Sequence, residues 1–220
     1  MPYTPVVVVC LSKDIPTDQL AATASARLDA TPWISAGPAR VFRIGARLRR
    51  ARLVQPARHT TVGGPLRLLD LDTMRREARD AYWYRWHVWR QVVDGTRDAQ
   101  PWWQFLDRHR EQPAKYSMAK ARQQYLAQPR VAAMSIYNAL PNKVMRLPTG
   151  HLEALQAGVH AYSHLGLLCA VPRDGLVVRD GRYLATASTR LADQLSYLDA
   201  AQQEISQLDP GEQLVALATA

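Results

Sequence analysis

The stretch that decides the fold is Val6–Leu11, with the sequence VVVVCL. Its β-branched side chains follow two prolines and precede Lys13 and Asp14, a pattern typical of a buried strand. Near the other end of the chain, residues 214–218 are also apolar, and we expect them to pair with this first strand. Both chain ends would then contribute to one small sheet.

The sequence between these two strands is mostly helical. Apolar residues recur at helical spacing over 17–28, 71–93, 101–112, 117–128, 130–140, 149–169 and 189–208. Thr17, Asp72 and Ser117 are the candidate N-caps. The dipeptide Asp180-Gly181 predicts a hairpin that joins residues 176–178 to 183–186. We therefore predict an α+β fold, in which a predominantly helical middle packs on a small, mainly antiparallel sheet formed from the N-terminal and C-terminal segments.

The length of 220 residues suits a single compact domain over 1–220 with a full hydrophobic core. Composition divides this domain into a basic strand-rich part (1–70), a helical part (71–170), and a last part with the hairpin, a helix and the final strand (171–220). Because 47% of the residues are hydrophobic, disorder by composition is excluded.

Several cellular settings are also excluded by the sequence. No run of 18 apolar residues predicts a membrane span, and the apolar run near the N-terminus is too short for a signal peptide. The two cysteines, Cys10 and Cys169, lie far apart and form no CxxC motif. We expect Cys10 to be a small core residue and the protein to be cytoplasmic, without a membrane partner.

Arginine dominates the charge of the chain. The net charge is +9, and 24 of the 28 basic residues are arginine. A GC-rich coding sequence would give this bias. A requirement for guanidinium groups, which bind phosphate through bidentate hydrogen bonds, would give it too. The bias alone therefore does not separate the two explanations.

The segment 40–56 carries the densest part of this charge. Apolar and basic residues alternate with period two from Phe42, and the phase slips by one at Arg49-Arg50. This pattern predicts a hairpin or a long bent strand with an exposed arginine face. No acidic residue occurs between Asp29 and Asp70. The predicted polyanion-binding residues are the eight arginines of this window: Arg40, Arg43, Arg47, Arg49, Arg50, Arg52, Arg58 and Arg67.

The acidic charge gathers at the other end of the chain. No basic residue follows Arg190, whereas this tail contains five acidic residues. Three interpretations of the arginine face therefore stay open. It binds nucleic acid or another polyanion, it docks on an acidic protein surface such as the tail of this chain or of a second copy, or it is simply solvated.

A second group of interest combines aromatic and basic residues around the sequence WYRWHVW, residues 83–89. Tyr82, Trp86 and Trp89 fall on the apolar stripe of the helix expected there, so we assign them to the core. Other residues of this region are candidates for a face that stacks on bases or docks on a partner: Arg76, Trp83, His87, Arg90, Trp102 and Trp103.

Signals for metal binding and catalysis are weak. Glu153, His160 and His164 would share one helix stripe and are the weak metal candidates, but the HExxH motif is absent. The chain also lacks GxSxG, Walker A and GxGxxG motifs. We therefore expect no metal, no cofactor and no catalytic residue.

Together these patterns favour a non-enzymatic binding protein whose arginine-rich face holds nucleic acid or another polyanion. One alternative is a structural subunit of a larger assembly, such as a virion or a multiprotein complex, that docks through its basic face and tryptophans, with a homo-oligomer among the possibilities. A further alternative is an enzyme with an unrecognised site around His87, His109 and His160.

Overall fold

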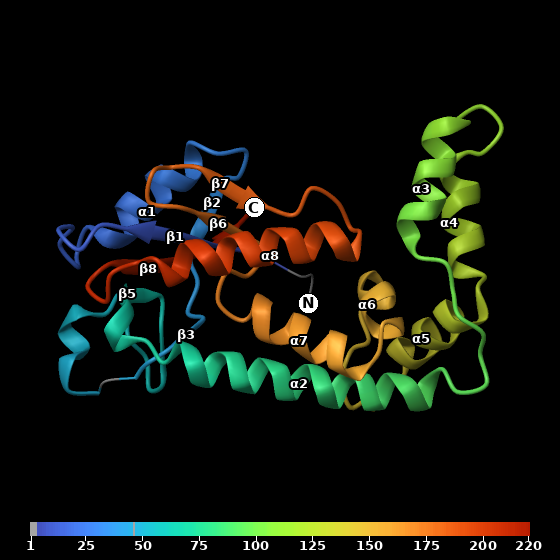
Figure 1. Cartoon of the computed structure of the whole chain (residues 1–220), viewed down its shortest axis with the longest axis horizontal. Coiled ribbons are helices and arrows are strands. Elements are labelled where there is room, and N and C mark those ends of the chain that lie inside the picture. The colour runs from blue at the N-terminus through green and yellow to red at the C-terminus, as the bar shows by residue number, and fades with distance from the viewer. Residues whose placement is uncertain (1–3, 46) are drawn as a thin grey trace. The chain divides into compact units, whose positions relative to one another are not determined.

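A computed structural model of the chain describes residues 4–45 and 47–220, which form two compact units (Figure 1). The sheet unit comprises Met1–Ala78, Leu167–Ala187 and Gln194–Ala220, and the helical unit comprises Arg79–Gly166 and Ser188–Asp193. The single domain over 1–220 stays a prediction. Three helices contribute residues to both units: α2 (Leu71–Val92), α7 (Val159–Cys169) and α8 (Leu191–Ser206).

The sheet unit is built on one mixed sheet. Its strand order is β2-β8-β1-β6-β7, and β5 also pairs with β8. A separate small sheet joins β3 to β4. The strands are β1 (Val6–Leu11), β2 (Ser35–Pro38), β3 (Phe42–Arg43), β4 (Thr60–Thr61), β5 (Gly63–Pro65), β6 (Gly175–Val177), β7 (Tyr183–Ala185) and β8 (Gln213–Thr219).

The predicted pairing of the two chain ends is confirmed. Strands β1 and β8 are antiparallel, with Val6 opposite Ala218 and Leu11 opposite Gln213. The α+β class is confirmed too, although the sheet is mixed rather than purely antiparallel, because β6 runs parallel to β1. A parallel pair needs a long connection, and residues 12–174 supply it.

The predicted hairpin at Asp180-Gly181 is also confirmed. Strands β6 and β7 pair antiparallel, with Leu176 opposite Leu184. Gly181 has a φ of 91°, a conformation that glycine adopts without the steric cost of a Cβ atom. The Asp180 carboxylate accepts a hydrogen bond from the Arg182 backbone N–H at 2.9 Å, which closes the turn.

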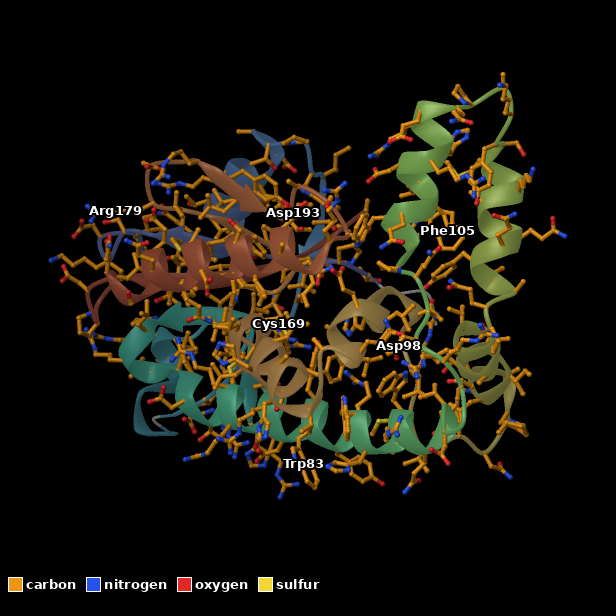
Figure 2. The ribbon with its side chains drawn as sticks, turned by 45° about the vertical axis from the view of Figure 1, so that its right-hand side comes forward. Trp83, Asp98, Phe105, Cys169, Arg179 and Asp193 are labelled. Carbon is orange, nitrogen blue, oxygen red and sulfur yellow. The ribbon has the colours of Figure 1, made fainter. Side chains whose placement is uncertain are left out.

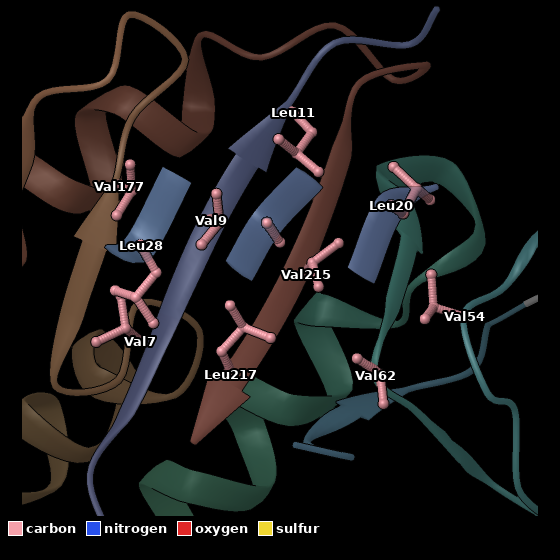
Figure 3. Packing of buried hydrophobic residues seen from close by; sticks show 11 residues of the cluster. Val7, Val9, Leu11, Leu20, Leu28, Val54, Val62, Val177, Val215 and Leu217 are labelled. Atoms are coloured by element: carbon pink, nitrogen blue, oxygen red, sulfur yellow. The ribbon is translucent and has the colours of Figure 1, made fainter. Parts of the chain in front are cut away.

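The core of the sheet unit lies between the sheet and helix α1 (Leu20–Asp29). Figure 3 shows Val7, Val9 and Leu11 on the sheet face that receives Leu20 and Leu28 of α1. Each of these side chains is fully or almost fully buried. Burying one aliphatic side chain contributes about 1.5 to 3 kcal/mol, so these contacts hold the strand and the helix together.

Two expectations near this core have different outcomes. Cys10 is buried as expected, and burial raises the pKa of its thiol to about 12. Thr17, however, does not cap α1. The helix begins at Leu20, because the Gln19 N–H bonds to the Pro16 carbonyl in a turn that precedes the helix.

The prediction of a hairpin or a long bent strand with an arginine face over 40–56 is wrong in both forms. Strand β3 covers only Phe42–Arg43, and Arg47–Arg52 form a 3₁₀ helix. Ile44 itself bridges to Leu69, and beyond this residue the chain no longer follows β4. A strand without a neighbour would leave its backbone groups unpaired, whereas the 3₁₀ helix pairs them locally, as in the 3.0 Å bond from the Leu53 N–H to the Arg50 carbonyl.

Further helices belong to the helical unit: α3 (Trp102–Glu111), α4 (Met118–Leu126), α5 (Pro129–Ala139) and α6 (Leu152–Gln156). The Ser117 side chain caps α4, as predicted. Helix α2 is capped by Asp70 rather than Asp72, because Asp70 accepts the bond from the Thr73 N–H. Phe105 points from α3 toward α4, where its ring lies 5.7 Å from that of Tyr125 (Figure 2).

The helix predicted over 149–169 is interrupted. Residues Thr149–His151 form a 3₁₀ helix, α6 follows, and α7 begins only at Val159. Gly158 lies between the two α-helices with a φ of 105°, which no residue of a right-handed helix can adopt. This break separates Glu153 from the histidines of α7.

Candidate polyanion-binding surface

Arg43 finds the counter-charge that its sequence neighbourhood lacks. Its Nε lies 3.6 Å from the Asp70 carboxylate, and its Nη1 pairs with Glu77. Both carboxylates lie just beyond the acid-free window, at the start of α2. Arg43 is therefore neutralised within the sheet unit and differs from the other predicted arginines.

Arg52 and Arg67 line one pocket of about 490 Å³ together with Lys13. We call these three residues the cationic cradle. All three side chains are exposed, and none forms an ion pair within 4–45 and 47–220. Asp14 is the one carboxylate in the pocket lining, so the lining carries three cations against one anion. This excess is the electrostatic feature that attracts an anionic ligand.

The sheet topology explains how Lys13 and Arg67, which are 54 positions apart in sequence, reach one pocket. Gln213 of β8 is opposite Leu11 of β1 on one side and Pro65 of β5 on the other. Lys13 and Arg67 each follow their strand residue by two positions. A Cβ atom built on Gly211 would lie 3.4 Å from a guanidinium nitrogen of Arg67 and 3.7 Å from the Lys13 side chain. Both cations therefore border the same glycine.

The remaining arginines of the predicted set have mixed roles. Arg40 donates a hydrogen bond to the Gln55 carbonyl, and Arg50 donates one to the Ala57 carbonyl, so both fasten the loop over 47–60. Arg58 is exposed and makes no ion pair in the described part of the chain. The side chains of Arg47 and Arg49 lie outside the described part.

The acidic residues of the tail form ion pairs with arginines outside the predicted polyanion-binding set. Glu212 lies 2.7 Å from Arg179, and Glu204 lies 2.9 Å from Arg182. Among the side chains that the structure describes, no ion pair joins the tail to residues 40–67. Docking of the arginine segment on the tail of the same chain therefore gains no support from these contacts.

The predicted aromatic face is partly formed. Trp83 is 50% exposed and points away from α2 (Figure 2), and its ring lies 4.1 Å from that of His87. Arg90 of the same helix is exposed. Arg76 belongs to the sheet unit, where its guanidinium donates to the Thr73 hydroxyl one turn earlier.

Trp102 and Trp103 are occupied by other contacts. Trp102 packs on Tyr125, with a ring distance of 5.3 Å. The Trp103 indole N–H donates to Glu153 at 3.1 Å, and the Arg190 guanidinium lies 4.6 Å from the centre of the Trp103 ring. Both tryptophans are half-buried and hold elements of the helical unit together. Less of their ring surface is therefore free to stack on a base or to contact a partner.

The weak metal candidates do not come together as one stripe. Glu153 lies on α6, whereas His160 and His164 are exposed on α7. The Glu153 carboxylate already accepts hydrogen bonds from Trp103 and from the Leu191 N–H. In the described residues, no group of three histidines, cysteines or carboxylates is placed to hold a metal ion.

The sequence did not predict a buried polar group in the helical unit, which consists of His151, Tyr162 and Arg85. The His151 Nδ1 lies 3.0 Å from the Tyr162 hydroxyl, and Arg85 donates to the same hydroxyl at 3.5 Å. Burial, together with the positive charge of Arg85, lowers the pKa of His151 to about 4. His151 is therefore neutral at physiological pH. Of the histidines suggested for an enzyme, His109 is held by a 2.7 Å contact between its Nδ1 and the Tyr116 carbonyl.

Within the described residues, no helix combines the length and apolar character needed to cross a membrane. Comparison with protein-family models, with curated proteins and with solved structures finds no significant match to this chain. What supports a function is therefore the geometry of the chain's own residues.

Proposed function

We propose that this protein binds polyanions, nucleic acid foremost, through the exposed cations of its sheet unit. The cationic cradle carries the proposal, because it places three exposed cations around one pocket with a single carboxylate in its lining. A phosphodiester backbone presents regularly spaced single negative charges and matches such a cluster. Contacts of this kind position a nucleic acid without reading its sequence.

Two further features support the proposal. Arg58 adds an exposed cation without an ion pair in the described part of the same unit. Arg67 and Lys13 also both border Gly211, since a Cβ atom there would lie 3.4 Å from a guanidinium nitrogen of Arg67 and 3.7 Å from the Lys13 side chain. A phosphate can therefore approach both side chains together.

The test is binding of a labelled DNA duplex and a labelled single strand across a salt series from about 50 to 200 mM. The variant carries Lys13→Gln, Arg52→Gln and Arg67→Gln. We expect the wild-type affinity to fall linearly in log salt. If the cradle contacts three phosphates, the triple variant should lower the slope for the duplex by about 2 to 3, since each phosphate contact contributes about 0.9.

The helical unit offers a matched control with Lys115→Gln, Arg122→Gln and Arg146→Gln. These side chains are exposed, make no ion pair among the described residues and remove the same three charges. If net charge alone governed binding, both triple variants would lose the same amount of DNA affinity. That result would contradict the proposal. Absence of binding at the lowest salt would also contradict it.

A structural subunit of an assembly is the second candidate, and one observation favours it. The helical unit exposes large apolar side chains, with Ile136 67% and Val144 68% exposed, besides Trp83. Exposed apolar groups of this kind are enriched at protein interfaces. Sedimentation of the wild type and of an Ile136→Asp, Val144→Asp variant tests it, because an assembled wild type and a monomeric variant would support this candidate.

A further inference from the structure

We propose that a second pocket of the sheet unit binds a small organic monocarboxylate. The pocket has a volume of about 350 Å³, within the range of small-molecule sites. It is separate from the cationic cradle, since the two linings share no residue. Its lining combines two guanidiniums, an imidazole, a hydroxyl and a carboxylate with apolar side chains: Val41, Arg43, His59, Thr60, Met74, Glu77, Ala78, Ala170 and Arg173.

Arg173 is the residue that points to an anionic ligand. Its Nε is buried and has no hydrogen-bond partner among the described residues. A buried donor without a partner is costly, and because the Nε is closed to solvent in this structure, a carboxylate bound beside Arg173 would satisfy it once the side chain turns toward the pocket. Arg173 also forms no ion pair within residues 4–45 and 47–220, so its charge is available to a ligand.

The backbone of Arg173 is held in an unusual conformation. Its φ is 57°, in the left-handed region that residues other than glycine seldom adopt. The Tyr197 hydroxyl donates to the Pro172 carbonyl at 3.0 Å, and Asp174 bonds to the backbone of Val6, so both neighbours are fixed. Strain of this kind persists where the surrounding structure imposes it, and it is common at ligand sites.

Arg43 is the second guanidinium of the lining and is fixed by its own partners. Its guanidinium pairs with Glu77 and Asp70, and its backbone N–H contacts the Met74 sulfur at 3.3 Å. Because the lining itself holds two guanidiniums and one carboxylate, Glu77, it retains about one net positive charge, and Arg173 is the guanidinium without an ion pair among the described residues. A monoanion balances this charge, whereas the second charge of a phosphate monoester would be repelled by Glu77.

The rest of the lining sets the character of the ligand's body. Val41, Met74, Ala78 and Ala170 provide apolar surface, which favours an aromatic or aliphatic group. The Thr60 hydroxyl and the His59 ring provide polar contacts beside it. An aromatic or aliphatic acid combines the required head and body in one small molecule.

The test is titration with benzoate, followed by the Nε–H resonance of Arg173 and by calorimetry. We expect saturable binding with a shift of that resonance, weaker binding of phenyl phosphate and none of benzylamine. Arg173→Gln should weaken benzoate binding by at least about tenfold, as expected for loss of a charge-assisted hydrogen bond. Arg173→Gly, which suits the left-handed backbone, should retain the fold and lose the binding equally.

Arg67→Gln is the matched control, since it removes an arginine of the same unit from the cradle alone. It should leave benzoate binding unchanged, and Arg173→Gln should leave nucleic-acid binding unchanged, so the two proposals can fail independently. No saturable benzoate binding, equal binding by the Arg173 variants, or tighter binding of phenyl phosphate or benzylamine would overturn the monocarboxylate site.

Discussion

Arg130 in the helical unit and Arg67 in the sheet unit show two uses of the same side chain. Arg130 is 4% exposed, and its guanidinium donates to the Thr96 hydroxyl and carbonyl, to Gln156 and to Asp98. It also lies 5.5 Å from the ring centre of Trp89. Arg67 is exposed and makes no ion pair with any described residue.

This difference bears on the arginine bias of the sequence. A bias that comes from base composition would place arginines without regard to their partners. The number of arginines therefore cannot tell this explanation from a requirement for guanidinium groups. A buried guanidinium that donates several hydrogen bonds inside the fold, as Arg130 does, supports structure, whereas an exposed guanidinium beside other cations is available to an external anion. Partners, rather than number, therefore separate the structural arginines from the binding candidates.

Arg130→Met tests the structural role of this buried arginine and should destabilise the protein more than any other substitution proposed here. The substitution leaves the Thr96 carbonyl without its donor and removes the guanidinium from Gln156, which keeps the bond from the Ala99 N–H. Asp98, the charged partner of Arg130, is exposed, so the free energy of unfolding should fall by about 2 to 4 kcal/mol. Urea denaturation followed by tryptophan fluorescence measures the change. Arg67→Gln is the control and should change stability by less than about 0.5 kcal/mol. Similar losses in both variants would show that the two arginines do not differ as described.

The elements of the fold that carry a local signal were predictable from sequence. The valine run β1, the hairpin at Asp180-Gly181 and the Ser117 cap each depend on neighbouring residues, and each is confirmed. The segment 40–56 failed because its period-two pattern needs a partner strand, which the sequence cannot reveal. The break at Gly158 was missed because a single glycine is also tolerated within a helix.

The candidate sites were predictable only in part, for a similar reason. Arg52 and Arg67 stood out by charge, but Lys13 joins them only because β1 and β5 both flank β8 at Gln213. One local signal for Lys13 was its place directly after the first strand. Arg173 had none, since its left-handed backbone and its unpaired Nε arise from tertiary contacts.

His151 tests the buried polar group around Arg85 through pH. Its folded pKa of about 4 lies below the unfolded value of 6.5, so the unfolded chain takes up the proton first as pH falls. The stabilising contribution is complete above pH 6.5, is lost between 6.5 and 4, and is constant below that. Over this range the free energy of unfolding should fall by about 2 to 3 kcal/mol from this residue.

His151→Gln isolates that contribution, because glutamine retains a polar group near Tyr162 and does not titrate. Urea denaturation at a series of pH values should give a flatter profile for the variant between pH 6.5 and 4. If the free energy of unfolding varied with pH in the same way in the wild type and in His151→Gln, burial and Arg85 would not be lowering the pKa of His151.

Glu77→Gln tests whether Arg43 belongs with the neutralised arginines, and it should change stability only slightly. It releases Arg43 from one of its two carboxylates, and because this pair is about half exposed, unfolding should become easier by only about 0.2 to 1 kcal/mol. Removing a negative charge from the lining of the monocarboxylate pocket should at the same time tighten benzoate binding by roughly threefold. Glu204→Gln, which breaks the pair with Arg182 outside that lining, should leave benzoate binding unchanged. Weaker benzoate binding in Glu77→Gln would show that Glu77 holds Arg43 in place for the ligand, and Arg43 would then belong with the binding arginines rather than with the neutralised ones.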